Sequence, residues 1–471
     1  MLARLLTLLL GVMTPVFARD LYVDPVSGDD RADGLAERVS GTSGPLKAIS
    51  QAIKRADPGD TIHLQPVVYR DYAGFHGKRG EPGRPITLDG HGATLEGSEP
   101  LDPAQWRETA PGLFSCTNLL RNDDAIMGRW FFLWDGKMNH MGRTSKGPSA
   151  PLKKAAELQP GEWTFVIEPS RTNPPSRAFF GAFHVKLPRG QKLADANIRA
   201  PLRSAGVQFS GTNAHLVIRN LTATHVYNDG FNIHGHCEDV RFENVAAIEC
   251  GDDGISAHET AQYHVDGFTS IGNSTGICDT GDSLTSYNNV FIRDCLGHDL
   301  YFLDTGCYSV SNAIVLSSAS RTLVVTGREQ TNRPCSLTLD NVFIRRETGS
   351  NEVRVTRNSV LSARHVTFFN LNFQATGGEV HLENCVVGGQ TPPDLILWKD
   401  AKWTARTNLY DLHQIRRDQT FYTAQTFAEF QRITGQDVGS RWRKLVVEAN
   451  APRGLPVGVG ANLTALRKLV R

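Results

Sequence analysis

The clearest indication of the fold is Val240-Arg-Phe-Glu-Asn-Val245, followed by Asp253-Gly-Ile-Ser-Ala-His258. Both pieces have a counterpart one unit earlier, in Val217-Ile-Arg-Asn-Leu221 and Asp229-Gly-Phe-Asn-Ile-His234, and looser copies continue to about Gly389. A β-rich repeat of about 20–27 residues is typical of a solenoid. One unit cannot bury its apolar face alone, so successive units stack as coils. Equivalent side chains of adjacent coils then lie about 4.8 Å apart.

The overall charge of the chain is balanced. Its 471 residues include 50 basic and 49 acidic residues, and the formal net charge is +1. Such a balance gives no reason to expect a nucleic-acid partner or attraction to a membrane surface. We therefore expect no nucleic acid, no membrane association and a monomeric protein.

The N-terminus has the pattern of an export signal. Arg4 precedes the apolar run 5–13, and Val16-Phe-Ala18 provides a small-residue cleavage site. The apolar run is too short to span a membrane. We expect residues 1–18 to be a signal peptide and the protein to be secreted or periplasmic. An N-terminal anchor is the alternative.

The eight cysteines allow two interpretations. Cys295 and Cys385 fall at equivalent points of their repeats, where a buried thiol would pack as a small hydrophobe. Cys237 and Cys250 lie within one coil and could form a disulfide, as exported proteins often do. No Cys/His spacing indicates a structural zinc.

Residues 19–100 are predicted to form an N-terminal cap and the first coils. Leu46, Ile49, Ile53 and Ala56 recur at helical spacing and predict an amphipathic helix. The terminal apolar face of a solenoid needs a cover, and this helix is a suitable lid.

The rest of the chain divides into three parts. Residues 101–200 break the repeat and contain Trp-rich strands, which predicts a small inserted β domain. Residues 201–390 are predicted to form the main parallel β-helix. In the tail, residues 391–471, the pattern Thr426-Phe-Ala-Glu429 resembles a capping box and Gly435 a helix stop. A tail helix should therefore pack on the side of the solenoid or cover its C-terminal end.

Three segments carry a family resemblance. Leu21-Tyr-Val-Asp-Pro25, Ala56-Asp-Pro-Gly-Asp-Thr-Ile-His-Leu64 and Leu158-Gln-Pro-Gly-Glu-Trp163 resemble segments of right-handed parallel β-helix proteins of the pectin-lyase-like superfamily. The resemblance implies an all-β fold, a right-handed parallel β-helix with an N-terminal capping helix and a small inserted β domain. It does not imply one reaction, because this fold hosts polysaccharide lyases, glycoside hydrolases, esterases and phage tailspikes.

The acidic residues of the repeat partly match the motifs of one group of enzymes with this fold. Asn228-Asp229 and Gly251-Asp252-Asp253 resemble the first two acidic motifs of polygalacturonase-like glycoside hydrolases. The first motif lacks the Thr of that family. The Gly-His-Gly of the family is missing from residues 272–280, and Gly297-His298-Asp299 comes one coil late. The basic residue that follows in the family is not found.

Glycoside hydrolysis needs two carboxyl groups, and adjacent coils would place Asp229 and Asp253 about 5 Å apart, near the separation in retaining enzymes. A skip of one coil would give about 9.6 Å, near the inverting end. Close carboxylates raise one another's pKa, which suits a general acid. A turn-capping role is the plain alternative, because Asp before Gly is common in turns. A cation site is a third. The chemistry requires no cofactor, the metal is unknown, and Ca²⁺ is a possible ligand.

Histidines follow the carboxylates in register. His234 and His258 take matching positions in consecutive strands, and the alternation of side chains points both outward. We predict four catalytic residues, namely Asp229, Asp252, Asp253 and His258. The predicted substrate-binding residues are Asn228, Asn232, His234, Glu259, His298 and Tyr301.

Three functions fit these features. The first is an exported glycoside hydrolase acting on a polysaccharide, which the aligned Asp and His residues favour. The second is a lyase on a uronate-containing polymer, which needs a cation or Arg and a base. No Lys is evident beside the acidic residues in the sequence. The third is a non-catalytic carbohydrate-binding surface protein, which the incomplete motif leaves open.

Overall fold

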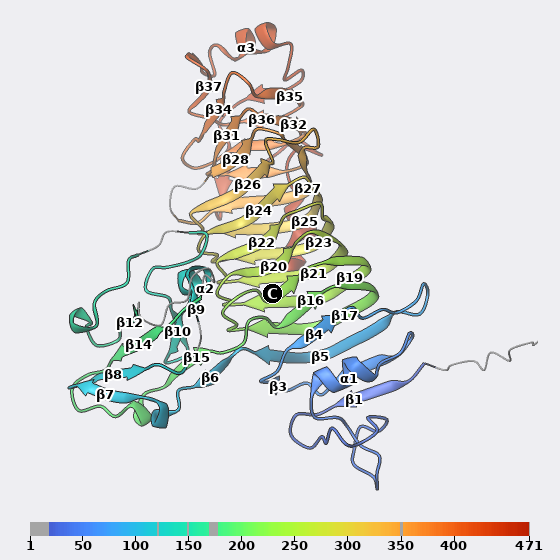
Figure 1. Ribbon diagram of the computed structural model, residues 1–471. Coiled ribbons are helices and arrows are strands. Elements are labelled where there is room, and N and C mark those ends of the chain that lie inside the picture. Colours follow the sequence, from blue (N-terminus) through green and yellow to red (C-terminus); the bar gives the residue numbers. More distant parts are fainter. Residues whose placement is uncertain (1–17, 120–121, 148–149, 169–177, 349–351, 471) are drawn as a thin grey trace, which may run out of the picture.

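The computed structural model describes residues 18–119, 122–147, 150–168, 178–348 and 352–470. Strands make up 51% and helices 8% of it. The main body is a tall stack of parallel coils (Figure 1), so the predicted all-β parallel β-helix is confirmed. The predicted signal peptide lies outside the described residues, apart from Ala18.

Two parallel sheets run the length of the stack. The long-strand sheet contains β1 (Asp20–Val23), β2 (Thr61–Leu64), β5 (Ile86–Glu96), β17 (Thr212–Thr224), β19 (His236–Ile248), β21 (Thr260–Ile271), β23 (Leu284–Arg293), β25 (Cys307–Ser317), β27 (Cys335–Arg346), β29 (Ser359–Arg364), β32 (Glu379–Glu383) and β35 (Lys402–Arg406). The short-strand sheet contains β4 (Ala73–His76), β16 (Val207–Ser210), β18 (Phe231–Ile233), β20 (Asp253–Ala257), β22 (Thr275–Asp279), β24 (His298–Asp304), β26 (Arg321–Gly327), β28 (Glu352–Thr356), β31 (Asn372–Thr376), β34 (Asp394–Leu397) and β37 (Gln414–Arg417).

The coils stack in the register that the repeat predicts. Phe231 pairs with Ile255, and Asn232 pairs with Ser256. Long strands bend at asparagines of positive φ, and Asn244 donates a side-chain hydrogen bond to Asn220 of the coil below at 3.0 Å. Asn tolerates this left-handed conformation better than most residues, and the stacked amides bond each other. The bend therefore repeats from coil to coil.

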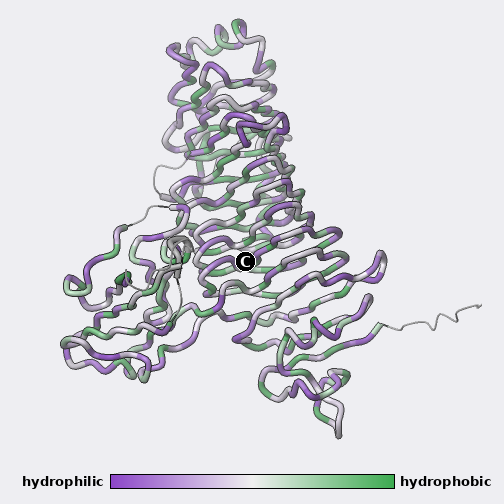
Figure 2. Tube along the Cα trace, in the orientation of Figure 1, coloured by the Kyte–Doolittle hydropathy of each residue, from purple (hydrophilic) through white to green (hydrophobic). Residues whose placement is uncertain are grey.

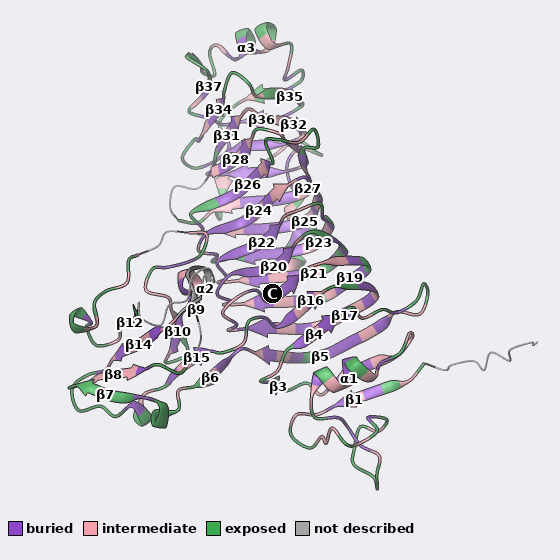
Figure 3. Cartoon of the chain, viewed as in Figure 1, coloured by how far each residue is buried: buried purple, intermediate pink, exposed green. Residues whose placement is uncertain are grey.

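Inward side chains form one continuous apolar core along the stack. In Figure 3 the strands of the stack are mostly coloured as buried, and in Figure 2 hydrophobic residues recur along them. All eight cysteines are free, and all but Cys307 are buried. Cys237 and Cys250 therefore form no disulfide, and the interpretation of buried thiols holds.

Helices cover both ends of the stack. At the N-terminal end, α1 (Ile49–Arg55) buries Ile49, Ala52 and Ile53 in the core. At the other end, α3 (Phe427–Thr434) buries Phe427 and Phe430, and Gly435 ends it with φ 66°. The predicted capping box is wrong, because the Thr426 hydroxyl accepts from the Thr423 amide and makes no bond to the helix.

The coils continue beyond residue 390, where we expected them to end. Strands β34 and β37 pair in parallel within the short-strand sheet, and β36 (Leu409–Tyr410) pairs with β39 (Arg441–Trp442). The end of the chain turns back, and Leu445 and Leu466 pack on outward apolar residues of the long strands. No helix among the described residues has the length and apolar character needed to cross a membrane.

A separate lobe stands beside the short-strand sheet (Figure 1). The chain leaves the stack along β6 (Ser98–Pro100) and returns along β15 (Ile198–Pro201), and these two strands pair antiparallel. Between them, β8 (Leu113–Cys116), β12 (Trp163–Ile167) and β14 (Gly181–Lys186) form a small antiparallel sheet. The lobe has its own aromatic core, built around Trp130, Phe132, Trp163 and Phe183. We call residues 101–197 the insertion.

Candidate functional site

The three predicted catalytic aspartates meet where neighbouring short strands begin. Asp253 is the first residue of β20, and Asp229 lies one coil below, just before β18. Asp229 Oδ1 accepts from the Asp253 amide at 3.0 Å, and its Oδ2 accepts from the Ser256 hydroxyl at 2.7 Å. Asp229, Asp252 and Asp253 are buried, and one carboxylate oxygen of each lies within 4.8 Å of the others.

The insertion supplies the counter-charges. Arg129 ends α2 (Asp124–Arg129), and its Nη1 lies 2.6 Å from Asp252 Oδ2 and also donates to the Asn228 side chain. Lys146 Nζ contacts Asp253 Oδ1 and lies 3.5 Å from Asp252 Oδ1. The Ser145 hydroxyl donates to Asp252. The site is therefore built by two parts of the chain.

These groups shift the pKa values of the three carboxyls in different directions. Burial and the neighbouring Asp252 raise the pKa of Asp253 well above its ordinary value, and the same causes raise the pKa of Asp229. Burial alone would also raise the pKa of Asp252, but Lys146 and Arg129 outweigh it and lower that pKa. Asp252 is therefore the ionised member, and protonation is favoured on its neighbours.

Lys146 stays charged despite its surroundings. Burial would lower its pKa, but Asp252 and Asp253 raise it well above the ordinary value. Asp229, Asp252 and Asp253 could together bind a cation, and they are the one acidic cluster of this kind among the described residues. The Lys146 ammonium contacts two of these three carboxylates. A divalent ion and the Lys146 ammonium would therefore compete for the same place.

The predicted histidine pair stacks at the far end of the same strands. The rings of His234 and His258 lie 4.0 Å apart and within 4° of parallel. His234 Nδ1 lies 3.2 Å from Glu259 Oε1, and Glu259 also accepts from the Gly235 amide at 2.8 Å. Burial and His234 lower the pKa of His258 to about 4, so His258 is a neutral imidazole near pH 7.

His298 and Tyr301 lie on the outer face of the short-strand sheet, on the coils that follow the aspartates. Asp253 aligns with Thr275, and Thr275 aligns with His298, so His298 lies two coils, about 9.6 Å, beyond Asp253. The His298 and Tyr301 rings stack at 4.2 Å and 11°. Burial, with the charges of Lys146 and Arg321, lowers the pKa of His298 to about 3. Both of its ring nitrogens are buried without a hydrogen-bond partner.

Outward residues of the short strands connect these groups. Asn232, Ser256, Cys278 and Tyr301 align on successive coils. The Asn232 amide donates to Gln208 at 3.3 Å, and burial raises the pKa of the Cys278 thiol well above its ordinary value, so that thiol is not a nucleophile near neutral pH.

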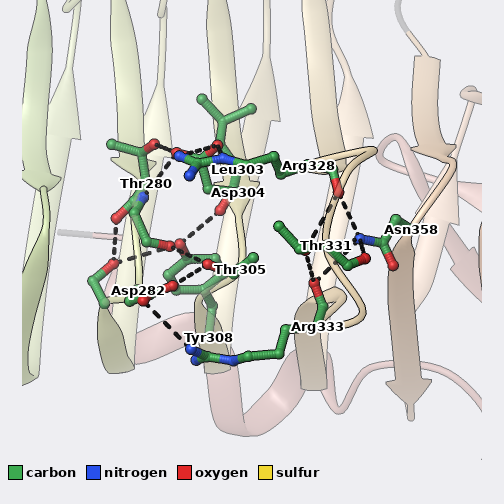
Figure 4. A network of polar contacts seen from close by, with 12 residues as sticks. Thr280, Asp282, Leu303, Asp304, Thr305, Tyr308, Arg328, Thr331, Arg333 and Asn358 are labelled. Atoms are coloured by element: carbon green, nitrogen blue, oxygen red, sulfur yellow. Dashed lines mark hydrogen bonds and ion pairs between the residues drawn. The ribbon is translucent and has the colours of Figure 1, made fainter.

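The turns that follow β22, β24 and β26 are tied together by a polar network (Figure 4). Asp304 accepts from the Thr280 hydroxyl and from the Gly281 amide at 3.0 Å, and Arg328 lies 3.2 Å from its other oxygen. Arg333 pairs with Asp282 at 3.3 Å. Each carboxylate has partners from neighbouring turns, so this network fixes the edge of the face.

Arg129, Ser145 and Lys146 were not among the predicted site residues. They lie about 100 residues before the aspartates, in a segment without the repeat, so alignment of the coils could not find them. No Lys beside the aspartates is evident in the sequence to support a lyase, whereas the structure places Lys146 against Asp253.

No family model and no curated protein matches the sequence. Solved structures with a similar fold include the complex of XylC with xylose, at 11% identity and a TM-score of 0.49, covering 90% of this chain and 82% of that one. A glycoside hydrolase is similar at 11% identity and a TM-score of 0.48, over 95% and 100% of the two chains. Pectate lyase Pel9A is similar at 13% identity and a TM-score of 0.36, over 77% and 76%. Similarity of this degree does not assign an activity.

Proposed function

We propose that the chain is a carbohydrate-active enzyme, a glycoside hydrolase that cleaves a polysaccharide at the face formed by β20, β22 and β24 beside Lys146. One observation carries this proposal. Asp252 and Asp253 are neighbours whose surroundings drive their pKa values apart, downward for Asp252 and upward for Asp253. Two carboxyl groups separated in this way can serve as base or nucleophile and as acid.

The roles follow from the contacts. Asp253, protonated, donates its proton to the glycosidic oxygen, which leaves as ionised Asp252 bonds to the anomeric carbon. Water, losing a proton to the Asp253 carboxylate, then hydrolyses this glycosyl ester and restores both groups. The oxygens lie within 4.8 Å of each other, close to the separation of about 5–5.5 Å in retaining enzymes. Asp229 is a positioning residue, because both of its oxygens are engaged by the Asp253 amide and Ser256. Neutral His258 and Tyr301 contact sugar hydroxyls.

The test is replacement of single carboxyl groups. We expect Asp253→Asn and Asp252→Asn each to lower the release of reducing ends from a panel of polysaccharides by at least about 100-fold. Asp266→Asn is the matched control, because Asp266 is exposed on the long-strand sheet, where it accepts hydrogen bonds from the Asn288 and Asn289 side chains. Unchanged turnover in both site variants would rule out the assignment.

A lyase on a uronate polymer is the second candidate, and Lys146 with Arg129 is the observation that favours it. Two cations beside the reacting centre could neutralise a substrate carboxylate. Lys146 is held protonated, so neutral His258 would be the base. An ultraviolet-absorbing unsaturated product would select the lyase, and a saturated reducing end the hydrolase.

We also propose that residues 1–18 direct export and are removed. The apolar run 5–13 and the small residue Ala18 support this. Mass spectrometry of the exported protein should find Arg19 at its N-terminus. Retention of Met1 on a membrane-bound protein would instead favour an anchor.

A further inference from the structure

Two large aromatic side chains lie exposed on the short-strand sheet, far from the aspartates. Trp398 follows β34 and is 45% exposed, and Phe421 lies in β38 (Thr420–Tyr422) and is 54% exposed. The Arg416 guanidinium lies 5.6 Å from the Trp398 ring and 5.8 Å from the Phe421 ring. We call these three residues the aromatic platform. Exposed apolar groups gathered in this way mark binding surfaces.

The platform lies on the same face as the candidate site. The row of outward positions that contains Tyr301 continues through Val324, Arg354, Gln374 and Ile396 to Arg416. These are five coil steps, or about 24 Å. One straight row of side chains therefore joins the two places, along the axis of the stack.

Polar groups border the platform and hold its indole in place. With its oxygen toward Trp398 and its nitrogen toward Glu352, the Gln374 side-chain amide accepts from Trp398 Nε1 at 3.1 Å and donates to Glu352 at 3.2 Å. Arg354 pairs with the same glutamate at 2.6 Å, while its Nε is buried without a hydrogen-bond partner. The edge of the Trp398 indole is thus fixed. Arg354, with its unpaired Nε, lies in the row between the platform and Tyr301.

We propose that the aromatic platform is a distal glycan-binding site, which stacks a sugar ring of a polysaccharide whose chain runs along the short-strand sheet to the candidate site. The proposal rests on the proposed function for the identity of the polymer. A pyranose ring offers an apolar C–H face to the indole and hydroxyls to the bordering amide and guanidinium. An extended polymer also matches a row that repeats its contacts at every coil.

Affinity gel electrophoresis of the full chain in gels containing xylan, hydroxyethylcellulose or polygalacturonate tests the platform. We expect at least one of the three polysaccharides to retard the wild-type protein. Trp398→Ala should weaken that retardation about tenfold, and Phe421→Ala should weaken it less. Ile433→Ala is the matched control, because Ile433 is a 52% exposed apolar residue on α3, and it should bind as the wild type.

The outcomes separate the platform from the activity. Asp253→Asn should lose cleavage and keep retardation, whereas Trp398→Ala should keep cleavage of short oligosaccharides and raise KM on the polymer. If Asp253→Asn still cleaves the polymer and Trp398→Ala no longer binds it, the proposed function is overturned and the platform is supported. Equal retardation of wild type and Trp398→Ala, or no retardation in any gel, would overturn the platform. Dimerisation of the wild type that Trp398→Ala abolishes, without glycan binding, would assign the surface to a second copy.

Discussion

Lys146 decides the charge state of the site. It is the residue of the insertion that reaches both Asp252 and Asp253, and its charge also lowers the pKa of His258 and His298. With Arg129 it favours the ionised form of Asp252, and it adds to the burial that keeps His258 and His298 neutral. The protonation of the candidate site therefore depends on a side chain of the insertion, Lys146, and not on the coils alone.

Replacement of Lys146 tests this role. Loss of a neighbouring positive charge raises the pKa of a carboxyl group, so Lys146→Met should shift the acidic limb of the pH–activity profile, assigned to Asp252, to higher pH by about one unit. The maximal rate should fall as well. Lys153→Met, which removes an exposed lysine of the same insertion paired with Glu162, is the control. An unmoved acidic limb in Lys146→Met would contradict the assigned charge pattern.

Asp299 should make the stability of the fold depend on pH. Its side chain is fully buried in the stack, where burial raises its pKa to about 7, although Ser317 donates to it. The unfolded chain ionises this carboxyl near its ordinary pKa of about 4, so folding stability falls as pH rises from about 4 to about 7.

Asp299→Asn should remove that dependence. We expect the variant to gain up to about 4 kcal/mol over the wild type at pH 8 and nothing at pH 4, since each pKa unit corresponds to about 1.4 kcal/mol. Denaturant unfolding at the two pH values measures the difference. Asp135→Asn, at an exposed turn residue of the insertion, should match the wild type at both. An equal effect of Asp299→Asn at both pH values would show that ionisation is not the cause.

The helix α3 matters at the scale of elements, because it closes the open end of the stack. Phe430 is fully buried, and its ring lies 5.2 Å from Tyr422 and 6.1 Å from Phe427. Without it, the last coil would expose its apolar side to water, and a solenoid end of this kind needs a cap. The helix forms without the predicted cap bond, so its packing stabilises it more than its N-terminus does.

Phe430→Ala should therefore cost about 3–5 kcal/mol and loosen the last coils first. Hydrogen exchange should show the loss of protection concentrated in β36, β37 and β39, with the coils around β20 unchanged. Ile433→Ala on the exposed side of the same helix should cost less than about 0.5 kcal/mol. Uniform loss of protection along the stack would mean that the coils unfold as one unit.

At the scale of the whole molecule, the part of the structure that the sequence predicts is the part that repeats. Asp229, Asp253, His234 and His258 could be aligned because each occupies a fixed position in its coil, and the sheet register brings equivalent positions together. The partners of these carboxylates come from the insertion, which has no repeat. The sequence around Lys146 has no pattern that predicts which coil its side chain contacts. The tail coils were missed for a related reason, because their strands are short and lack the Asp-Gly pattern.

Removal of the insertion tests this division. The strands that enter and leave it are antiparallel neighbours, with Glu99 opposite Ala200, so residues 101–197 can be replaced by a short Gly-Ser linker. The apolar core of the stack and that of the insertion share no residue, so the shortened chain should keep a β circular dichroism spectrum and cooperative unfolding. Without Arg129 and Lys146, however, Asp252 loses both cations that hold it ionised, and turnover should fall at least as far as in Asp252→Asn. A stack that no longer folds would show that the insertion stabilises the coils it covers, whereas a shortened chain that keeps full activity would remove Lys146 and Arg129 from the mechanism.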